Sequence, residues 1–324
     1  MKNILILSAG RRVELIERFK AARKRLNIEG NIIAVDISKT APAVHFADKY
    51  HIIPRISDEK YIDSIIEVCQ NEKIDLIVPT IDTELVKLAL NRELIEEKTD
   101  AKLLLSNLQV VEICSDKNKT QKFFEENNFG VPNQISDEDI ADGNYSFPLF
   151  IKPKDGSSSI NTFKIENKKQ LEFFKEYVKE PILQEFMEGE EFSVDVFCDF
   201  ECNPVTIVPR VRIATRGGEI AKGRIVKDRD VINDAKRVVE SLKPIGHITI
   251  QCMKTNQGIK YIEINPRFGG GAPMSIDAGA DSCENLYRLL DGEKLEYNEN
   301  YMENTVFVRF DSSIMLNEDM ERIK

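Results

Sequence analysis

Short apolar stretches alternate with amphipathic stretches along the first third of the chain. Apolar runs bounded by polar residues predict buried strands, and apolar residues spaced three and four apart predict helices. In chain order these stretches are NILILS, RRVELIERFKAARKRL, NIIAVDI, YIDSIIEVCQNE, IDLIVPT, DTELVKLALNRELI and AKLLLS. Because parallel strands need a crossover between them, this alternation over residues 1–112 predicts a parallel, doubly wound sheet of the α/β class.

The pattern changes after residue 112. A helix in CSDKNKTQKFFEENNFGVP, capped by Ser115 or Asp116, should stop at Gly130. Two short strands then flank the polar loop of FPLFIKPKDGSSSINTFKI, and long strands, helices and the hairpin HITIQCMKTNQGIKYIEIN follow. We expect a mixed α+β region here, divided into domains over residues 113–182 and 183–324.

The hairpin places three oxygen-bearing side chains together. A three-residue loop ending at Gly258 would pair Thr255 with Ile259 and set Gln251 opposite Glu263. Cross-strand partners share a face, and Asn265 lies two residues further along it. The opposite face, toward the core, would then carry Ile250, Ile262 and Ile264. Oxygen ligands suit Mg²⁺ or Mn²⁺, although a solvated sheet face would also explain the pattern.

Cations precede this hairpin in the chain. Lys152 ends a strand, Lys117 opens a helix whose amides favour anions, and DGSSS supplies a flexible backbone with three hydroxyls. Arg210 and Arg212 share one strand face within VPRVRIATRGGEIAKGR. Together they suggest an anion site, with surface lysines, an ordinary turn and a solvated charged face as the alternatives.

Composition removes several classes of protein. The net charge of −10 argues against a general nucleic-acid binder, and no apolar run is long enough to span a bilayer. The N-terminus shows no cleavage site, so we expect a cytoplasmic protein. Six scattered cysteines form no CxxC pair, and the three histidines are better explained as structural residues than as catalytic ones.

The first predicted sheet offers weak nucleotide signals. ILSAGRR follows the first strand but carries only Gly10, so the glycine pattern of dinucleotide-binding folds is not met. Asp36 ends the second strand, where a ribose-binding acid would lie. Thr80, Asp82 and Glu84 follow another strand at an edge where α/β sheets bind ligands, although Asp82 could simply cap a helix.

The chain resembles the ATP-grasp superfamily, and in particular stand-alone proteins similar to one half of the carbamoyl-phosphate synthetase large subunit. The residues that carry the resemblance are SDKNKTQKFF, FPLFIKPKDGSSS, LQEFMEGEEFSVDVF and IQCM with YIEINPRFGGG. The likeness covers nearly the whole chain. It implies a Rossmann-like pre-ATP-grasp domain followed by a two-subdomain ATP-grasp fold that binds ATP with Mg²⁺ (or Mn²⁺).

The resemblance also implies roles for individual residues. For the nucleotide, it implies that Lys117 and Lys152 contact the phosphates and that residues 155–159, with Gly156, Ser157 and Ser158, form a lid loop. It also implies an adenine hinge at Gln184, Glu185 and Met187, and contact of Glu191 with the ribose. For the chemistry, it implies Gln251, Glu263 and Asn265 as magnesium ligands, Arg267 at the transferred phosphoryl group, and Gly269–Gly271 as room for the acceptor. We expect Arg210 and Arg212 to face the cleft and bind the acceptor's carboxylate, because a guanidinium binds a carboxylate bidentately.

The implied reaction is carboxylate activation. Phosphoryl transfer would give an acyl phosphate, which an amine then attacks, so the partners would be small carboxylate and amine substrates, with a homodimer possible. Carbamoyl phosphate is not the expected product, because only one synthetase half and no glutaminase are visible. The alternatives are a non-catalytic or regulatory ATP-binding module and, with weaker support, a nicotinamide-dependent dehydrogenase.

Overall fold

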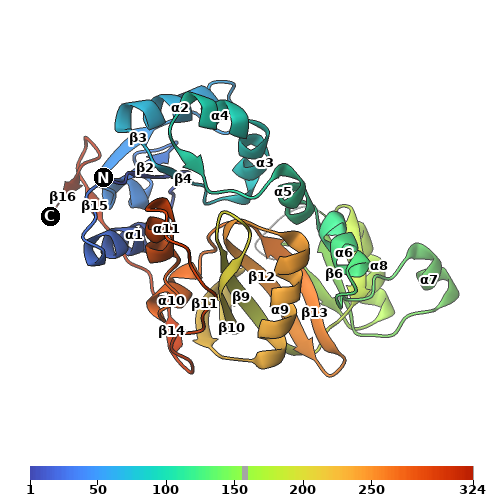
Figure 1. Cartoon of the computed structure of the whole chain (residues 1–324). Coiled ribbons are helices and arrows are strands. Elements are labelled where there is room, and N and C mark those ends of the chain that lie inside the picture. The colour runs from blue at the N-terminus through green and yellow to red at the C-terminus, as the bar shows by residue number, and fades with distance from the viewer. Residues whose placement is uncertain (155–159, 324) are drawn as a thin grey trace.

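The structure is a computed structural model that describes residues 1–154 and 160–323. Figure 1 shows the N-terminal region above a large sheet, with a smaller sheet at one side. Within the described residues, the strands form sheets of five, six and three strands and a short hairpin near the C-terminus. No helix in these two ranges is long and apolar enough to cross a membrane.

The N-terminal region is the predicted parallel sheet. Its strand order is β3-β2-β1-β4-β5, and every adjacent pair is parallel. The strands are β1 (Ile4–Ile6), β2 (Ile32–Asp36), β3 (Lys49–Ile52), β4 (Leu76–Val78) and β5 (Lys102–Leu103). The helices are α1 (Val13–Arg25), α2 (Tyr61–Glu72), α3 (Asp82–Leu90) and α4 (Arg92–Lys98), with a 3-10 turn, η1 (Pro42–His45). The expected helix over DTELVKLALNRELI is therefore two helices that meet at Asn91.

The smaller sheet follows in the chain. It has the antiparallel order β7-β6-β8, built from β6 (Leu149–Pro153), β7 (Phe163–Ile165) and β8 (Pro181–Glu185). Its helices are α5 (Leu108–Ser115), α6 (Lys117–Glu126), α7 (Asp137–Asp142) and α8 (Lys168–Tyr177). Of the two candidate caps of α6, Asp116 is the one used, because its carboxylate accepts the amide of Asn118 at 2.8 Å. The helix ends at Glu126, four residues before Gly130.

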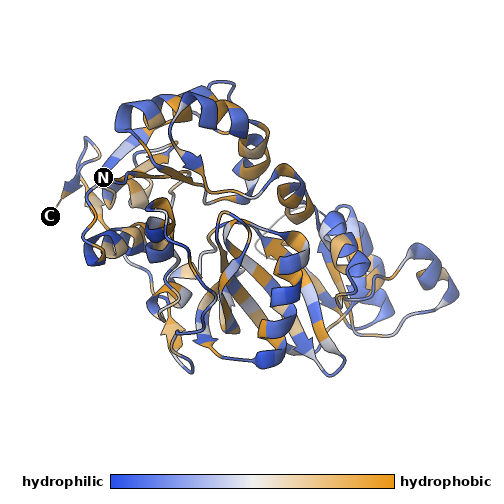
Figure 2. Ribbon diagram, viewed as in Figure 1, coloured by the Kyte–Doolittle hydropathy of each residue, from blue (hydrophilic) through white to orange (hydrophobic). Residues whose placement is uncertain are grey.

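The large sheet is built mainly from antiparallel neighbours. Its order is β13-β12-β9-β10-β11-β14. Its strands are β9 (Gly189–Cys198), β10 (Pro204–Arg216), β11 (Glu219–Ile225), β12 (Gly246–Thr255), β13 (Gly258–Asn265) and β14 (Val306–Val308). The helices are α9 (Arg229–Leu242), α10 (Ala272–Asp277) and α11 (Ser282–Leu290), and β15 (Met315–Leu316) pairs with β16 (Arg322–Ile323). Figure 2 shows apolar residues concentrated on the strands, with polar residues on the outer face of α9.

The hairpin between β12 and β13 reaches the predicted register by another route. Its turn has two residues, because Thr255 pairs with Gly258 and not with Ile259. A bulge between Cys252 and Gln251 then shifts the pairing by one residue, so Gln251 does lie opposite Glu263. The bulge also corrects one expectation, since Ile262 lines a cavity instead of joining the core.

One apolar core joins the N-terminal sheet to the end of the chain. The ring of Phe19 in α1 lies 6.0 Å from that of Phe268 and 6.3 Å from that of Tyr287 in α11. Because Phe268 directly precedes Gly269–Gly271, this packing fixes the glycine loop against the N-terminal region. The division into domains over 1–112, 113–182 and 183–324 stays a proposal, with this core shared across it.

Candidate active site

A cavity of about 320 Å³ lies between the smaller sheet and the large sheet. Eight of its lining residues are those expected to bind ATP and its metal: Lys117, Lys152, Gln184, Glu185, Met187, Glu191, Gln251 and Glu263. Arg212, which was expected at the acceptor's carboxylate, also lines this cavity. Its other lining residues were not predicted from the sequence; they are chiefly Phe150, Ile160, Phe186, Met253 and Ile262. These are apolar, and apolar walls with a few convergent polar groups are typical of small-molecule pockets.

Two lysines meet at one end of this cavity. Lys152 comes from β6, and Lys117 stands at the start of α6 with its ammonium donating to the carbonyl of Pro153 at 3.0 Å. Burial, and secondly the charge of Lys117, lower the pKa of Lys152 to about 8, against the opposing effect of Glu263. A pKa depressed in this way indicates positive charge that is partly desolvated and not balanced by anions.

The three expected metal ligands gather around one carboxylate oxygen. Glu263 Oε1 accepts the side-chain amide of Gln251 at 2.7 Å and that of Asn265 at 3.0 Å. The Gln251 amide would present its oxygen to a cation after rotation of its terminal group, and Asn265 Oδ1 already faces the Arg267 guanidinium, so the set can offer hard oxygen donors. Within the described residues no group of three His, Cys, Asp or Glu could hold a metal, which leaves a mixed carboxylate–amide set as the candidate.

The other end of the cavity suits a base and a sugar. Gln184 is buried on β8, and its Oε1 has no hydrogen-bond partner among the described residues, so it is available to a ligand donor. Glu185 is already engaged, because it accepts the amide of Asn133 at 3.0 Å and pairs with Lys260. Glu191 remains open to the cavity, where burial raises its pKa against the opposing charge of Arg212.

Arg212 and Arg210 do not share the expected environment. Arg212 lines the nucleotide cavity, where its Nε lies 3.1 Å from Glu191 and its NH2 group donates to the carbonyl of Gly218 at 2.9 Å. Arg210 is only 2% exposed, and its guanidinium pairs with the buried carboxylate of Asp195 at 2.7 Å. The expectation that both arginines face the cleft is therefore revised for Arg210.

Arg210 lies directly beneath the glycine loop. A Cβ atom added to Gly271 would come within 2.4 Å of the Arg210 guanidinium, so the close approach requires glycine. Asp195 also accepts the hydroxyls of Thr249 at 2.8 Å and Ser275 at 2.6 Å. Burial alone would raise the pKa of Asp195, but Arg210 and then His247 hold it below the usual range. This network supports the loop from below.

Arg267 lies on the other side of the glycine loop, at the boundary with the N-terminal region. Its guanidinium donates to Asp82 at 2.6 Å and to Asn265 Oδ1 at 3.0 Å. It therefore connects the candidate metal ligands to α3. Arg12 was not predicted as a site residue; its guanidinium lies 3.5 Å from Glu219 in β11. The only signal for Arg12 was its position after the first strand.

The weak nucleotide signals of the N-terminal sheet have structural explanations. Asp36 accepts the amides of Gly10 at 2.8 Å and Ser38 at 3.2 Å, so it closes the first turn. Thr80 and Glu84 are fully buried, and Glu84 accepts the Thr80 amide at 2.9 Å. Asp82 begins α3, and its carboxylate faces Arg267. Gly156, Ser157 and Ser158 of the expected lid lie outside the described residues.

Comparison with known proteins agrees with this arrangement. Residues 4–102 match the family of PylC-like N-terminal domains, and residues 114–271 match an ATP-grasp domain family. A carbamoyl-phosphate synthase from Methanobrevibacter smithii is 29% identical over 51% of this chain and 45% of its own length. A 3-methyl-D-ornithine–L-lysine ligase from Methanosarcina acetivorans is 22% identical over 87% of this chain and 72% of its own length.

The fold is also shared with a solved structure. An N5-carboxyaminoimidazole synthetase from Staphylococcus aureus, complexed with ADP, superposes with a TM-score of 0.75 at 18% identity, covering 98% of this chain and 83% of that one. The two family matches adjoin each other in the order that the fold requires, and the cavity lies within the second. The chain therefore carries an ATP-grasp domain over residues 114–271, preceded by a PylC-like N-terminal domain over residues 4–102.

Proposed function

We propose that the chain is an ATP- and Mg²⁺-dependent carboxylate–amine ligase that works through an acyl phosphate on a small carboxylate or amino acid. One observation carries this proposal: Lys117, Lys152 and Glu263 line the same cavity, while Asn265 links Glu263 to Arg267 beside the glycine loop. The proposed phosphate-binding lysines and metal ligands thus share one cavity, and Asn265 connects them to Arg267 beside the glycine loop. We further propose that it acts in the cytoplasm.

The nucleotide would lie along the cavity. Gln184 and the neighbouring Met187 would contact the base, Glu191 the ribose hydroxyls, and Lys117 with Lys152 the phosphates. The unpartnered Oε1 of Gln184 supports this direction, because an adenine amino group is a donor and this buried atom accepts. Arg212 would hold Glu191 in place at the ribose end.

The candidate metal ligands fit Mg²⁺ or Mn²⁺. Gln251, Glu263 and Asn265 would hold the ion, and when bound it would neutralise charge on the phosphate oxygens. Arg267 would stabilise the same charge from the acceptor side, since its second contact is Asn265. The support is the donor set itself, one carboxylate with two amides, because hard cations prefer oxygen.

The proposed reaction consists of two successive nucleophilic substitutions, first at phosphorus and then at carbon. A carboxylate oxygen of the acid attacks the γ-phosphorus of ATP, the bond to the β–γ bridging oxygen breaks, and ADP leaves. The amine nitrogen then attacks the acyl carbon, inorganic phosphate leaves, and the amine loses a proton. The protein contributes mainly position and charge neutralisation, as in other phosphoryl transfers.

Hydroxylamine tests this mechanism. With ATP, Mg²⁺ and an accepted acid, hydroxylamine should trap the acyl phosphate as a hydroxamate in amounts equal to the ADP formed. Formation of AMP and pyrophosphate would mean adenylation and would refute the proposal. Tight ATP binding without any hydroxamate across a broad panel of acids would instead favour the regulatory ATP-binding module.

The dehydrogenase alternative has a specific weakness. A dinucleotide-binding first turn needs room at its glycines and an acid left for the ribose. Here Asp36 uses its two oxygens to close the turn at Gly10 and Ser38. A nicotinamide absorbance change on addition of a hydroxy acid would revive this alternative.

A further inference from the structure

A second cavity lies in the N-terminal region, beside Asp82. It has a volume of about 530 Å³, within the usual range for ligand pockets. Its walls come from the segments that follow β1, β2, β3 and β4, at the carboxyl edge of the sheet where α/β folds bind ligands. Ile81 and Thr83 line it on either side of Asp82, whose carboxylate pairs with Arg267.

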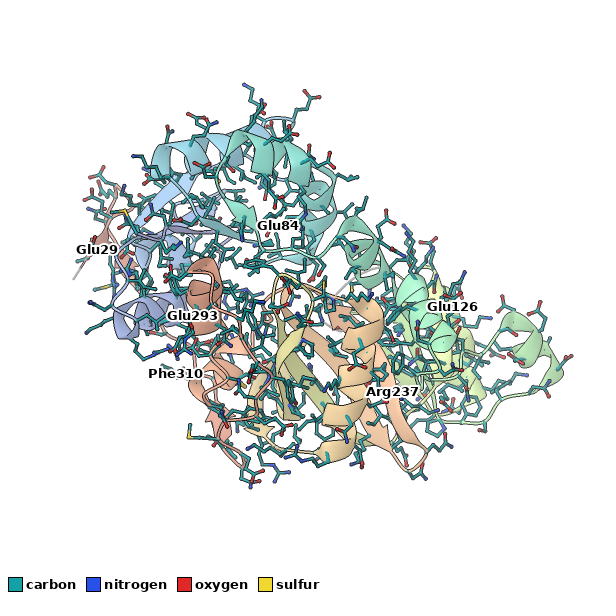
Figure 3. All side chains as sticks on the ribbon, in the orientation of Figure 1. Glu29, Glu84, Glu126, Arg237, Glu293 and Phe310 are labelled. Carbon is teal, nitrogen blue, oxygen red and sulfur yellow. The ribbon has the colours of Figure 1, made fainter. Side chains whose placement is uncertain are left out.

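The surface of this cavity is mainly apolar. Five aliphatic residues contribute to its lining, Ile37, Ile53, Pro54, Ile56 and Ile81, and the charged residues Asp36 and Arg55 also line it. The hydroxyls of Ser8 and Tyr61 are turned to the buried Glu84, which they contact at 2.6 and 2.8 Å. Those two residues therefore offer carbon surface to a ligand. Figure 3 shows Glu84 on the side of the N-terminal region that faces the large sheet.

Next to this mainly apolar cavity lie paired charged groups. Arg267 pairs with Asp82 at 2.6 Å, and Glu219, beside Gly270, lies 2.9 Å from Arg309 and 3.5 Å from Arg12, so guanidinium and carboxylate groups are paired near the glycine loop. The Asp82 side chain is 43% exposed, so one of these carboxylates remains accessible. An amino acid carries the complementary charges, a carboxylate for the arginines and an ammonium for the acids.

We propose that this cavity holds the side chain of the acceptor, and that the acceptor is an amino acid with a medium-sized or large apolar side chain. Its carboxylate would lie at Arg267 and Arg12, its ammonium at Asp82, and its side chain against Ile37 and Ile81. This inference rests on the proposed ligase function. It goes further by excluding bicarbonate and alanine as preferred substrates, because these would leave the apolar surface in contact with water.

The test uses alanine, leucine, methionine, phenylalanine, glutamate and lysine as probes in the hydroxamate assay. Leucine, methionine or phenylalanine should exceed alanine in kcat/KM by about tenfold or more, the scale of discrimination by apolar side-chain groups. Ile37→Lys should raise the KM of that amino acid by about tenfold, with the KM of ATP unchanged. Ile37 is 47% exposed, so this substitution should not prevent folding.

Ile52→Lys is the matched control. Ile52 is 43% exposed, pairs with Asp36 on the adjacent strand, and does not line the cavity. Binding of leucine to the full chain with Mg-ADP, measured by calorimetry, provides a readout that does not depend on turnover. It should be lost in Ile37→Lys and kept in Ile52→Lys.

The outcomes separate the two proposals. Hydroxamate formation that responds equally to both substitutions, or that favours alanine, glutamate or lysine, would overturn the pocket assignment and leave the ligase function standing. Leucine binding that depends on Ile37, without hydroxamate from any amino acid, would support the pocket and refute the ligase mechanism.

Discussion

Two positively charged regions flank the candidate reaction centre, and they are built differently. In the nucleotide cavity, burial and then the like charge of Lys117 lower the pKa of Lys152 to about 8. Across the glycine loop, Arg267 and Arg12 each lie against a carboxylate, Asp82 and Glu219. The first region suits a polyanion that brings its own negative charge. The second pairs its guanidinium groups with carboxylates, with Arg309 also donating to Glu219 at 2.9 Å, and suits a ligand of mixed charge.

Removal of the central carboxylate should have the largest effect, because both sides depend on it. Glu263→Gln keeps the shape of the side chain but leaves Gln251 and Asn265 around a neutral amide. We expect turnover to fall by about a hundredfold or more, and Mg-ATP to lose its stabilising effect on the melting temperature. Glu240→Gln, on the exposed face of α9, is the control. Normal turnover in Glu263→Gln would contradict the metal assignment.

Substitution of the two neighbouring arginines of β10 should have different effects on the free energy of unfolding, because one is fully buried and the other lines the nucleotide cavity. Arg210→Met leaves Asp195 buried without its cation, so the free energy of unfolding should fall by about 3–5 kcal/mol in a urea titration. Arg212→Met removes a partner from the more exposed Glu191, so it should raise the KM of ATP with a smaller loss of stability. Equal destabilisation by the two variants would show that the buried Arg210–Asp195 pair contributes no more to stability than the contact of Arg212 with Glu191.

The pH dependence of ATP binding should identify the nucleotide region. Phosphates favour protonated Lys152, whose pKa in the free protein is about 8. Affinity should therefore be greatest below pH 8 and fall as the pH rises above it, by up to about tenfold per pH unit. Lys152→Arg keeps the charge throughout this range, so its profile should be flat. A sloping profile in Lys152→Arg would assign the titration to another group.

The smallest effect on kinetics is expected from loss of Asp82, the carboxylate that pairs with Arg267 on the acceptor side. Asp82 is partly exposed, so Asp82→Asn should change the KM of the amino acid only a few-fold and leave the KM of ATP unchanged. Asp277→Asn removes a similar ion pair, with Arg18 at 2.6 Å, elsewhere on the boundary with α1. If both variants behave alike, Asp82 serves only to join the two regions.

The sequence predicted the fold well where local pattern is decisive. The parallel sheet follows from apolar runs and amphipathic helices that are each complete within a few residues. Edge strand β3 was not predicted, because its residues are mostly exposed and carry no apolar run. The break between α3 and α4 at Asn91 was also missed, since the apolar spacing continues through it.

The candidate site was predictable where its residues lie in a single hairpin. Gln251 and Glu263 lie in one hairpin, so pairing alone brought them together. Arg210 could not be placed in the same way, because its partner Asp195 lies on β9 and nothing local indicates that it is covered by Gly271. The contact of Arg267 with Asp82 joins residues far apart in the chain, and only tertiary packing determines it.

The bulge in the β12–β13 hairpin has a consequence for how this chain can vary. Pairing on the turn side of the bulge is out of step by one residue with pairing on the Gln251 side. A turn longer by one residue, combined with loss of the bulge, would therefore leave Gln251 opposite Glu263. The outer end of the hairpin can thus exchange a two-residue turn for a three-residue turn without moving the carboxylate and without changing the length of the chain.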